Sequence, residues 1–130
     1  MTREIVRPGG VASSPNYAHA IKKTGTPIFI SGQVALDGDG NIVGDGDAAA
    51  QADQVFHNLG LVVEACGGSF ADVVKLTIFT TDLAYRPAIG AARGRHFPAG
   101  EMPGSTFVVV SSLADPRFLI EVEAVAVIGE

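Results

Sequence analysis

Residues 73–82 read Val73-Val74-Lys75-Leu76-Thr77-Ile78-Phe79-Thr80-Thr81-Asp82, and most of them are β-branched or aromatic. Such side chains pack well on a pleated surface, so this run predicts a β-strand. Its even positions, from Val74 to Thr80, are almost purely apolar, whereas its odd positions include Lys75 and Thr77. Because alternate residues point to opposite faces, we expect one face to pack on helices and the other to meet a cleft or a second subunit.

Apolar spacing predicts a helix on each side of this strand, which places the strand in the middle of a sheet. Residues 52–66 carry apolar side chains at helical spacing, and Asp47 before them can cap the helix. A second helix is expected to begin near Pro87, because proline suits the first helical position. Its apolar stripe runs to Phe97.

Five further strands are predicted, at 2–6, 19–23, 27–33, 105–110 and 118–128. Thr24-Gly25-Thr26 is a turn signal, so the runs 19–23 and 27–33 are expected to pair as an antiparallel hairpin. Ser31-Gly32 interrupts an apolar strand, which favours a bulge or a close approach by a backbone or ligand. Ser69 and Asp72 have the spacing of a capping box. The order β-β-β-α-β-α-β-β indicates an α+β fold with a mixed sheet and both helices on one face.

Such a sheet would have one face without a cover. The last two predicted strands carry more apolar side chains than one buried face requires. These side chains are Val108, Val110, Val122, Ala124 and Ala126. Oligomerisation is the simplest way to cover the second face.

Composition narrows the class of protein. A chain of 130 residues predicts one domain, 1–130, large enough for a core. No apolar run approaches the roughly 20 residues of a membrane helix, and the N-terminus carries no apolar signal core. With one cysteine, the chain is expected to be cytoplasmic and without a membrane partner. The net charge of −5 and the scattered Lys and Arg residues predict no nucleic-acid partner.

Glu121 and Glu123 lie two apart in a predicted strand and therefore share one face. A carboxylate in an apolar strand is costly to bury unless it is paired or hydrogen-bonded. These residues are candidates for a general acid or base, or for orienting water. A structural ion pair or a solvated strand edge would explain the same pattern.

Other reactive side chains lack a supporting pattern. The three histidines have no metal-site spacing, and the Asp37 to Asn41 run lacks the later ligands of a calcium loop, so no metal is expected. No phosphate-binding or dinucleotide-binding glycine motif is present, so we expect no cofactor. Cys66 falls on the apolar stripe of the first helix and is expected to be a core thiol. Ser31 lacks a nucleophile elbow.

Four segments, in order, resemble the Rid/YjgF family of reactive-intermediate deaminases, whose members are also labelled endoribonuclease L-PSP. They are 16–20 (NYAHA), 28–33 (IFISGQ), 73–82 and 120–126 (IEVEAVA). The resemblance implies a chorismate-mutase-like fold and a homotrimer, in which the sheets line a central barrel and ligand clefts lie between subunits. This agrees with the uncovered sheet face.

The resemblance also implies a set of site residues. In the family, the clefts are lined by residues that match Tyr17, Ser31, Gly32, Thr106 and Glu121 here. The glutamate is thought to hold the water that attacks an imine carbon.

This chain departs from the family pattern at two positions. An arginine usually precedes the Ser-Thr of the fifth strand and clamps the substrate carboxylate, but that position is Gly104. An asparagine usual in the second helix falls on Gly90. Losing a bidentate clamp costs roughly 1.5–3 kcal/mol. We therefore do not expect the standard 2-imino acid deaminase activity. Arg93 and Arg117 are candidates for a replacement cation.

The leading functional prediction is a hydrolase or deaminase of an enamine, imine or related C–N bond. Glu121 would orient and partly deprotonate a water molecule. The Thr106 hydroxyl and backbone N–H groups near Gly32 would hold the substrate in place, and Tyr17 would line the cleft. Gly104 leaves room for a bulkier small-molecule substrate. A non-catalytic trimer that binds a metabolite is the alternative, and an RNA-cleaving inhibitor of translation is the third.

Overall fold

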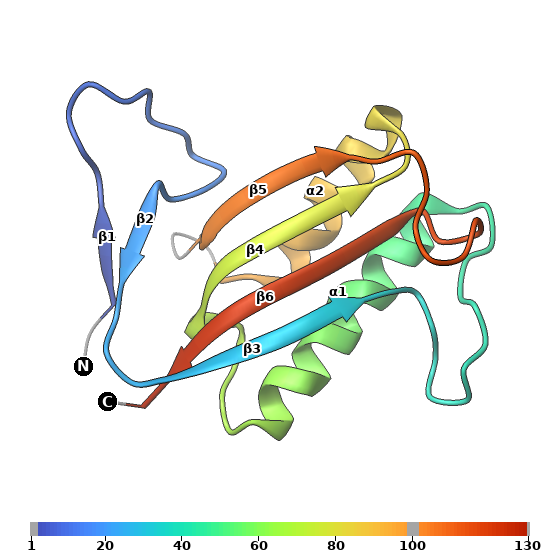
Figure 1. The fold of residues 1–130 in the computed structure, drawn as a ribbon, viewed down its shortest axis with the longest axis horizontal. Helices are drawn as coiled ribbons and strands as arrows, with labels where there is room; N and C mark the ends of the chain where they lie inside the picture. The colour runs from blue at the N-terminus through green and yellow to red at the C-terminus, as the bar shows by residue number, and fades with distance from the viewer. Residues whose placement is uncertain (1–2, 99–101, 130) are drawn as a thin grey trace.

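Four strands form one mixed sheet in the structure, a computed structural model that describes residues 3–98 and 102–129. In spatial order they are β3 (Thr26–Gln33), β6 (Ile120–Ile128), β4 (Val73–Thr80) and β5 (Gly104–Val109). Strands β4 and β5 are parallel, and the other two pairs are antiparallel (Figure 1). Because β4 lies between β6 and β5, its predicted central position is confirmed. The predicted start of the first strand, Thr2, lies outside the described residues.

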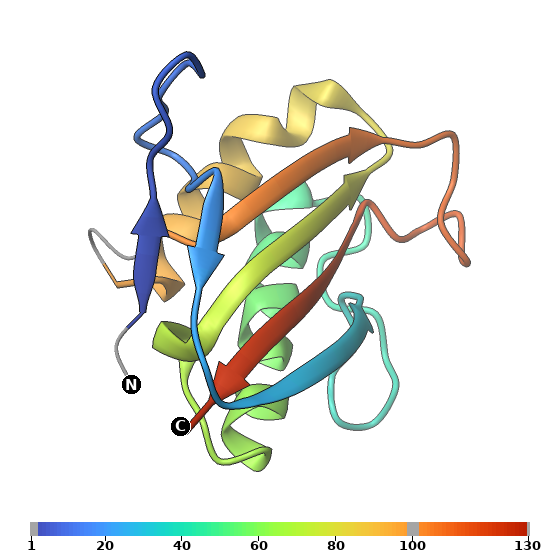
Figure 2. The same ribbon diagram turned by 60° about the vertical axis from the view of Figure 1, so that its left-hand side comes forward.

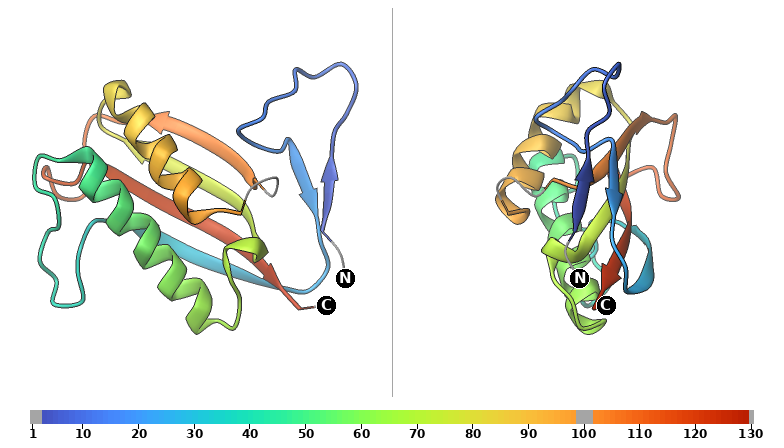
Figure 3. Two further views of the ribbon diagram at one scale, coloured as in Figure 1. Left: turned by 180° about the vertical axis from the view of Figure 1, so that it is seen from behind. Right: turned by 90° about the vertical axis from the view of Figure 1, so that its left-hand side faces the viewer.

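Two helices, α1 (Ala48–Ala65) and α2 (Arg86–His96), cover one face of the sheet (Figure 3). The Asp47 carboxylate caps α1 by accepting a hydrogen bond from the backbone N–H of Ala50 at 3.1 Å. Helix α2 carries proline in its first turn, as predicted. The predicted α+β class, with both helices on one face, is confirmed. Within the described ranges, neither helix is long and apolar enough to cross a membrane.

Side chains of β4 alternate between the core and the open face. Leu76, Ile78 and Thr80 are buried, which confirms that the even positions pack toward the helices. The alternation breaks at the start of the strand, where the register with β6 shifts between Val73 and Lys75. Val73 is therefore buried in place of Val74, contrary to the simple even–odd pattern. The opposite core wall comes from α1, where Val55, Phe56 and Leu59 are fully buried.

The predicted hairpin between 19–23 and 27–33 is wrong. Strands β1 (Glu4–Val6) and β2 (Ala20–Lys22) pair with each other in a separate two-stranded sheet, and β3 pairs with β6 (Figure 2). We call residues 4–22 the N-terminal arm. Gly25, at φ +145°, packs so closely on β6 that a Cβ there would lie 2.6 Å from the Gly129 carbonyl oxygen. The turn therefore redirects the chain onto β6 instead of reversing it.

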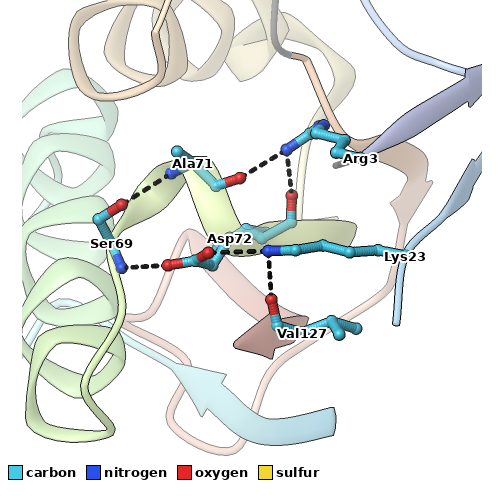
Figure 4. Close-up of polar contacts among 7 residues, drawn as sticks. Arg3, Lys23, Ser69, Ala71, Asp72 and Val127 are labelled. Atoms are coloured by element: carbon cyan, nitrogen blue, oxygen red, sulfur yellow. Dashed lines mark hydrogen bonds and ion pairs between the residues drawn. The ribbon is translucent and has the colours of Figure 1, made fainter. Parts of the chain in front are cut away.

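Two residues that flank the arm, Arg3 and Lys23, make polar contacts with the sheet and with the turn before β4 (Figure 4). Lys23 Nζ donates to Asp72 Oδ1 at 2.8 Å and to the Val127 carbonyl at 2.5 Å. Asp72 also completes the predicted capping box with Ser69 before β4. Arg3 Nη1 donates to the Ala71 carbonyl at 2.7 Å.

Two further placements differ from the sequence-based expectation. Val122, Ala124 and Ala126 face the helices and are buried, so they do not supply the open face. Their register makes the alternate residues of β6, beginning with Glu121, the ones on the open face. Cys66 is exposed, because α1 ends at Ala65 and the C-cap turn carries the thiol out of the apolar stripe.

Candidate functional site

Strand β3 bulges where Ser31-Gly32 interrupts it, and this brings its backbone close to Glu121. The register with β6 shifts between Ile30 and Gln33, so Ser31 and Gly32 together oppose the single residue Glu123 and β3 accommodates one extra residue. A Cβ on Gly32 would overlap the Glu121 carboxylate and would lie 2.7 Å from its Cδ atom. The expected bulge is confirmed, and the group that approaches closely is the predicted catalytic carboxylate.

Glu121 is half-buried on the open face of β6, beside Phe79 of β4. Glu123, two residues on, is exposed and pairs in register with Thr77. Within the described residues, no hydrogen bond or ion pair engages the Glu121 side chain, and no carboxylate–cation pair includes Glu123. A structural ion pair within the chain therefore does not explain either carboxylate.

Thr106 and Gly104 lie on the neighbouring part of the open face, where β5 runs parallel to β4. Gly104 pairs with Lys75, and Thr106 pairs with Thr77. Lys75 Nζ donates a hydrogen bond to Thr106 Oγ1 at 2.5 Å. A Cβ on Gly104 would meet Lys75 Cδ at 3.6 Å, an ordinary van der Waals contact. The Lys75 side chain therefore lies beside Gly104, the position at which the resemblance to the family implies an arginine.

Tyr17 is carried by the N-terminal arm, which docks on the start of β5. The backbone N–H of Ala18 donates to the Pro103 carbonyl at 3.1 Å, and Ala18 forms a parallel bridge with Gly104. Tyr17 stacks edge-to-face on His19, with 5.4 Å between ring centroids. The tyrosine, 38% exposed, lines a cavity of about 580 Å³ between the arm, β5 and α2. Gly90, at which the resemblance to the family implies an asparagine, also lines this cavity.

One chain brings the predicted site residues together in two groups. Glu121, Gly32 and Ser31 belong to the β3–β6 side of the sheet, whereas Tyr17, Gly104 and Thr106 belong to the β5 side. The two cavities lined by Tyr17 include no residue of the β3–β6 group, and the cavity lined by Gly32 includes none of the β5 group.

The candidate replacement cations differ in their surroundings. Arg117 is exposed and pairs with Asp115, with 2.8 Å between Nη2 and Oδ2. Hydrogen bonds from the Arg117 side chain and backbone lower the pKa of Asp115 to about 2. Arg93, in contrast, lines the cavity beside Gly90. Sequence reasoning named Arg93 but missed Arg86 and Lys75, which also lie near predicted site residues. A seven-residue spacing on one helix face was the available signal for Arg86.

Metal ligands do not gather anywhere in the part of the chain that the structure describes, since no three His, Cys, Asp or Glu side chains form a group. The Asp37 loop is a turn in which its carboxylate accepts from the N–H groups of Asp39 and Asn41. Both hydrogen bonds go to Asp37 Oδ1, so this carboxylate oxygen stabilises the turn.

Comparisons with known proteins agree with this architecture. The Endoribonuclease L-PSP family model matches residues 9–128. A RutC family protein of Synechocystis is 36% identical over 113 residues, which cover 86% of this chain and 85% of that protein. The crystal structure of the Rid-family protein YyfB of Yersinia pestis has a TM-score of 0.90, 34% identity and coverage of 98% of this chain and 100% of its own. A Thermotoga maritima protein provisionally described as an endoribonuclease has a TM-score of 0.75, 32% identity and full coverage of both chains. The chain therefore belongs to the Rid/YjgF family, which is also known as the endoribonuclease L-PSP family.

Proposed function

We propose that this protein is a homotrimeric hydrolase that releases ammonia from an enamine or imine in clefts between subunits. The observation that carries the proposal is the Glu121 carboxylate, which is half-buried against Gly32 and has no cationic partner in the described chain. A carboxylate held in this way is available to a bound water molecule.

Trimerisation would unite the two groups of site residues. Phe29 is 78% exposed on the open face of β3, next to Val125 of β6, and such an apolar face favours burial in an interface. If the β3–β6 side of one copy meets the β5 side of the next, Glu121 of one copy would face Tyr17 and Thr106 of its neighbour. Each of three equivalent seams would then hold one site.

In the proposed reaction, Glu121 accepts a proton from water while the water oxygen bonds to the imine carbon. The π electrons of the C=N bond move to nitrogen, which takes this proton from Glu121, and a carbinolamine forms. Glu121 then accepts the hydroxyl proton of the carbinolamine and passes it to nitrogen, so that a C=O double bond forms as the C–N bond breaks and ammonia leaves. An enamine enters the same sequence after protonation at carbon.

Lys75 and Thr106 would position the substrate. The ammonium of Lys75 and the hydroxyl of Thr106 are already joined by a 2.5 Å hydrogen bond beside Gly104. A lysine is a single point charge and lacks the planar fork of the arginine that the family usually places here. An acidic substrate would be attracted but not clamped, and the small Gly104 would admit a bulkier one.

The test compares Glu121→Gln with Glu123→Gln, two variants that remove one carboxylate each from the same face of β6. Ammonia release is measured over a panel of enamines and imines. Glu121→Gln should lower kcat by roughly 100-fold or more, because general acid–base catalysis contributes factors of this order. Glu123→Gln should retain turnover. Equal turnover in the Glu121→Gln variant would refute the mechanism, and a ligand that binds saturably but is recovered unchanged would indicate a non-catalytic binding trimer.

RNA cleavage is the second candidate, because the family model and the Thermotoga maritima protein carry an endoribonuclease name. The net charge of −5 disfavours it, since RNA binders replace phosphate counterions with basic side chains. Micromolar RNA affinity that falls steeply between 50 and 200 mM salt, together with cleavage, would favour this candidate over the deaminase.

A further inference from the structure

The cavity between the N-terminal arm, β5 and α2 contains cationic side chains and no acidic ones. Its lining residues are Ser14, Asn16, Tyr17, Ile78, Arg86, Ile89, Gly90, Arg93, Ser105 and Phe107. The volume of about 580 Å³ is within the range of small-molecule sites. The whole chain has 14 Asp and Glu residues against nine Lys and Arg, yet both charged groups of the lining are arginines. The lining therefore favours an anionic ligand.

Arg93 lacks the partner that a partly buried guanidinium requires. Its Nε atom is buried and has no hydrogen-bond partner among the described residues. Burial lowers the pKa of Arg93, and the nearby charge of Arg86 lowers it further. A buried N–H donor without an acceptor is costly, and an oxyanion in the cavity would satisfy it.

Other arginines show that the fold can supply acidic partners. On the same helix, Arg95 Nη2 donates to Asp53 Oδ1 at 2.7 Å. Arg117 pairs with Asp115. No ion pair within the described ranges includes Arg86 or Arg93. Within the described residues, the two cations of the cavity therefore lack an acidic partner.

Arg86 is held in position by an aromatic ring. Its guanidinium carbon lies 5.2 Å from the centroid of the Phe107 ring, within the range of a cation–π contact. Arg86 and Arg93 are seven residues apart on α2, which is two helical turns and about 10 Å along the helix axis. Both line the cavity, so the two cations are spread along its length.

The rest of the lining carries no charge. It includes the polar residues Ser14, Asn16 and Ser105, and also Ile78 and Ile89, which are almost fully buried. Gly90 leaves one wall open, since a Cβ there would meet nothing within 4 Å. A small ligand with an acidic group at each end matches the two arginines of this lining.

We infer that this cavity binds a small dicarboxylate, with one carboxylate at the partly buried Arg93 and the other at Arg86 beside Phe107. The cavity shares Tyr17 with the proposed reaction site, but binding requires neither Glu121 nor turnover. The proposed reaction and this binding site can therefore fail independently.

The test titrates the full-length protein with glutarate, with glutaramate, in which one carboxylate is an uncharged amide, and with inorganic phosphate. Binding is measured by calorimetry. The wild type should bind glutarate at least tenfold more tightly than glutaramate, because only glutarate neutralises both arginines. Equal binding of the two compounds, or tighter binding of phosphate, would overturn the dicarboxylate assignment.

Variants assign the effect to the two arginines. Arg86→Gln and Arg93→Gln should each remove the preference for glutarate, whereas Arg95→Gln removes the same charge from the same helix outside the cavity and should retain it. A similar loss in Arg95→Gln would show that net charge, and not the cavity, attracts the ligand.

Gly90→Leu tests the cavity without changing any charge. The leucine side chain would fill the space beside Arg93 and should weaken glutarate binding at least tenfold. It should also raise the melting temperature, because leucine has a higher helix propensity than glycine. Unchanged glutarate binding in a folded Gly90→Leu protein would place the ligand elsewhere.

Discussion

Glycine at position 32 leaves the space in which the Glu121 carboxylate lies. The carboxylate is the flexible end of a side chain, so a methyl group at residue 32 would displace it without disturbing the backbone. Gly32 does not require the left-handed backbone region, since its φ is not positive. The position therefore matters for the site more than for stability.

We predict that Gly32→Ala lowers turnover to a level close to that of Glu121→Gln, roughly 100-fold below wild type, while the free energy of unfolding changes by no more than about 1 kcal/mol. Kinetic assays and urea denaturation measure the two effects. Gly38→Ala is the matched control, because a Cβ at residue 38 would meet nothing within 4 Å. Wild-type turnover in Gly32→Ala would show that the position of the Glu121 carboxylate does not limit the reaction.

At the scale of elements, an ion pair joins the turn before β4 to the residue that follows β2. The Lys23 side chain is 9% exposed and that of Asp72 is 25% exposed, so this pair is partly shielded from solvent. Burial alone would raise the pKa of Asp72. The hydrogen bonds from Lys23 and from the Ser69 N–H, with the charges of Lys23 and Arg3, outweigh burial and lower the pKa.

We predict that Asp72→Asn destabilises the protein by roughly 2 kcal/mol at pH 7, because Lys23 loses its charged partner. The difference from wild type should shrink as the pH falls below about 4, since the unfolded state then binds the proton that folded Asp72 resists. Urea denaturation at pH 7 and at pH 3 measures both effects. Asp115→Asn is the control, because its ion pair with Arg117 is exposed and should contribute little. A difference that does not vary with pH would exclude Asp72 ionisation as its origin.

At the scale of the whole molecule, the helices cover one face of the sheet and leave the other open (Figure 3). Phe29 is the most exposed large apolar side chain of the described chain. It lies on the open face, as Glu121, Thr77 and Thr106 do. Covering this face would bury Phe29 and would at the same time enclose the Glu121 carboxylate in a cleft shielded from bulk solvent.

We predict that the wild type has a solution mass three times the 13.4 kDa of one chain and that Phe29→Glu dissociates it. A buried, unpaired carboxylate at each equivalent interface would be costly. Sedimentation equilibrium gives the mass. Leu83→Glu is the control, because Leu83 is also exposed but precedes α2, away from the sheet face. A monomeric wild type would contradict the proposed assembly.

Local patterns were enough for much of the fold. The alternation in β4, the Asp47 cap and the Ser69–Asp72 capping box each depend on residues within a few positions of one another, and each is observed. The Ser31-Gly32 interruption correctly indicated a bulge. For the site, the resemblance to the family supplied the residues, and local spacing alone left the carboxylates of β6 open to several interpretations.

Contacts between residues that are distant along the chain could not be predicted from local sequence patterns. The choice of β6 over β2 as the neighbour of β3 depends on the close packing of Gly25 against the C-terminal end of β6, about 100 residues away. The meeting of Gly32 with Glu121 and the placement of Tyr17 and Phe107 beside Arg86 and Arg93 have the same origin. Hydrophobic periodicity and helix caps depend on residues that are close together in the sequence, so the sequence by itself determines them. Contacts between distant segments depend on which of many competing pairings buries the most apolar surface. Only the tertiary structure shows which pairing the chain adopts.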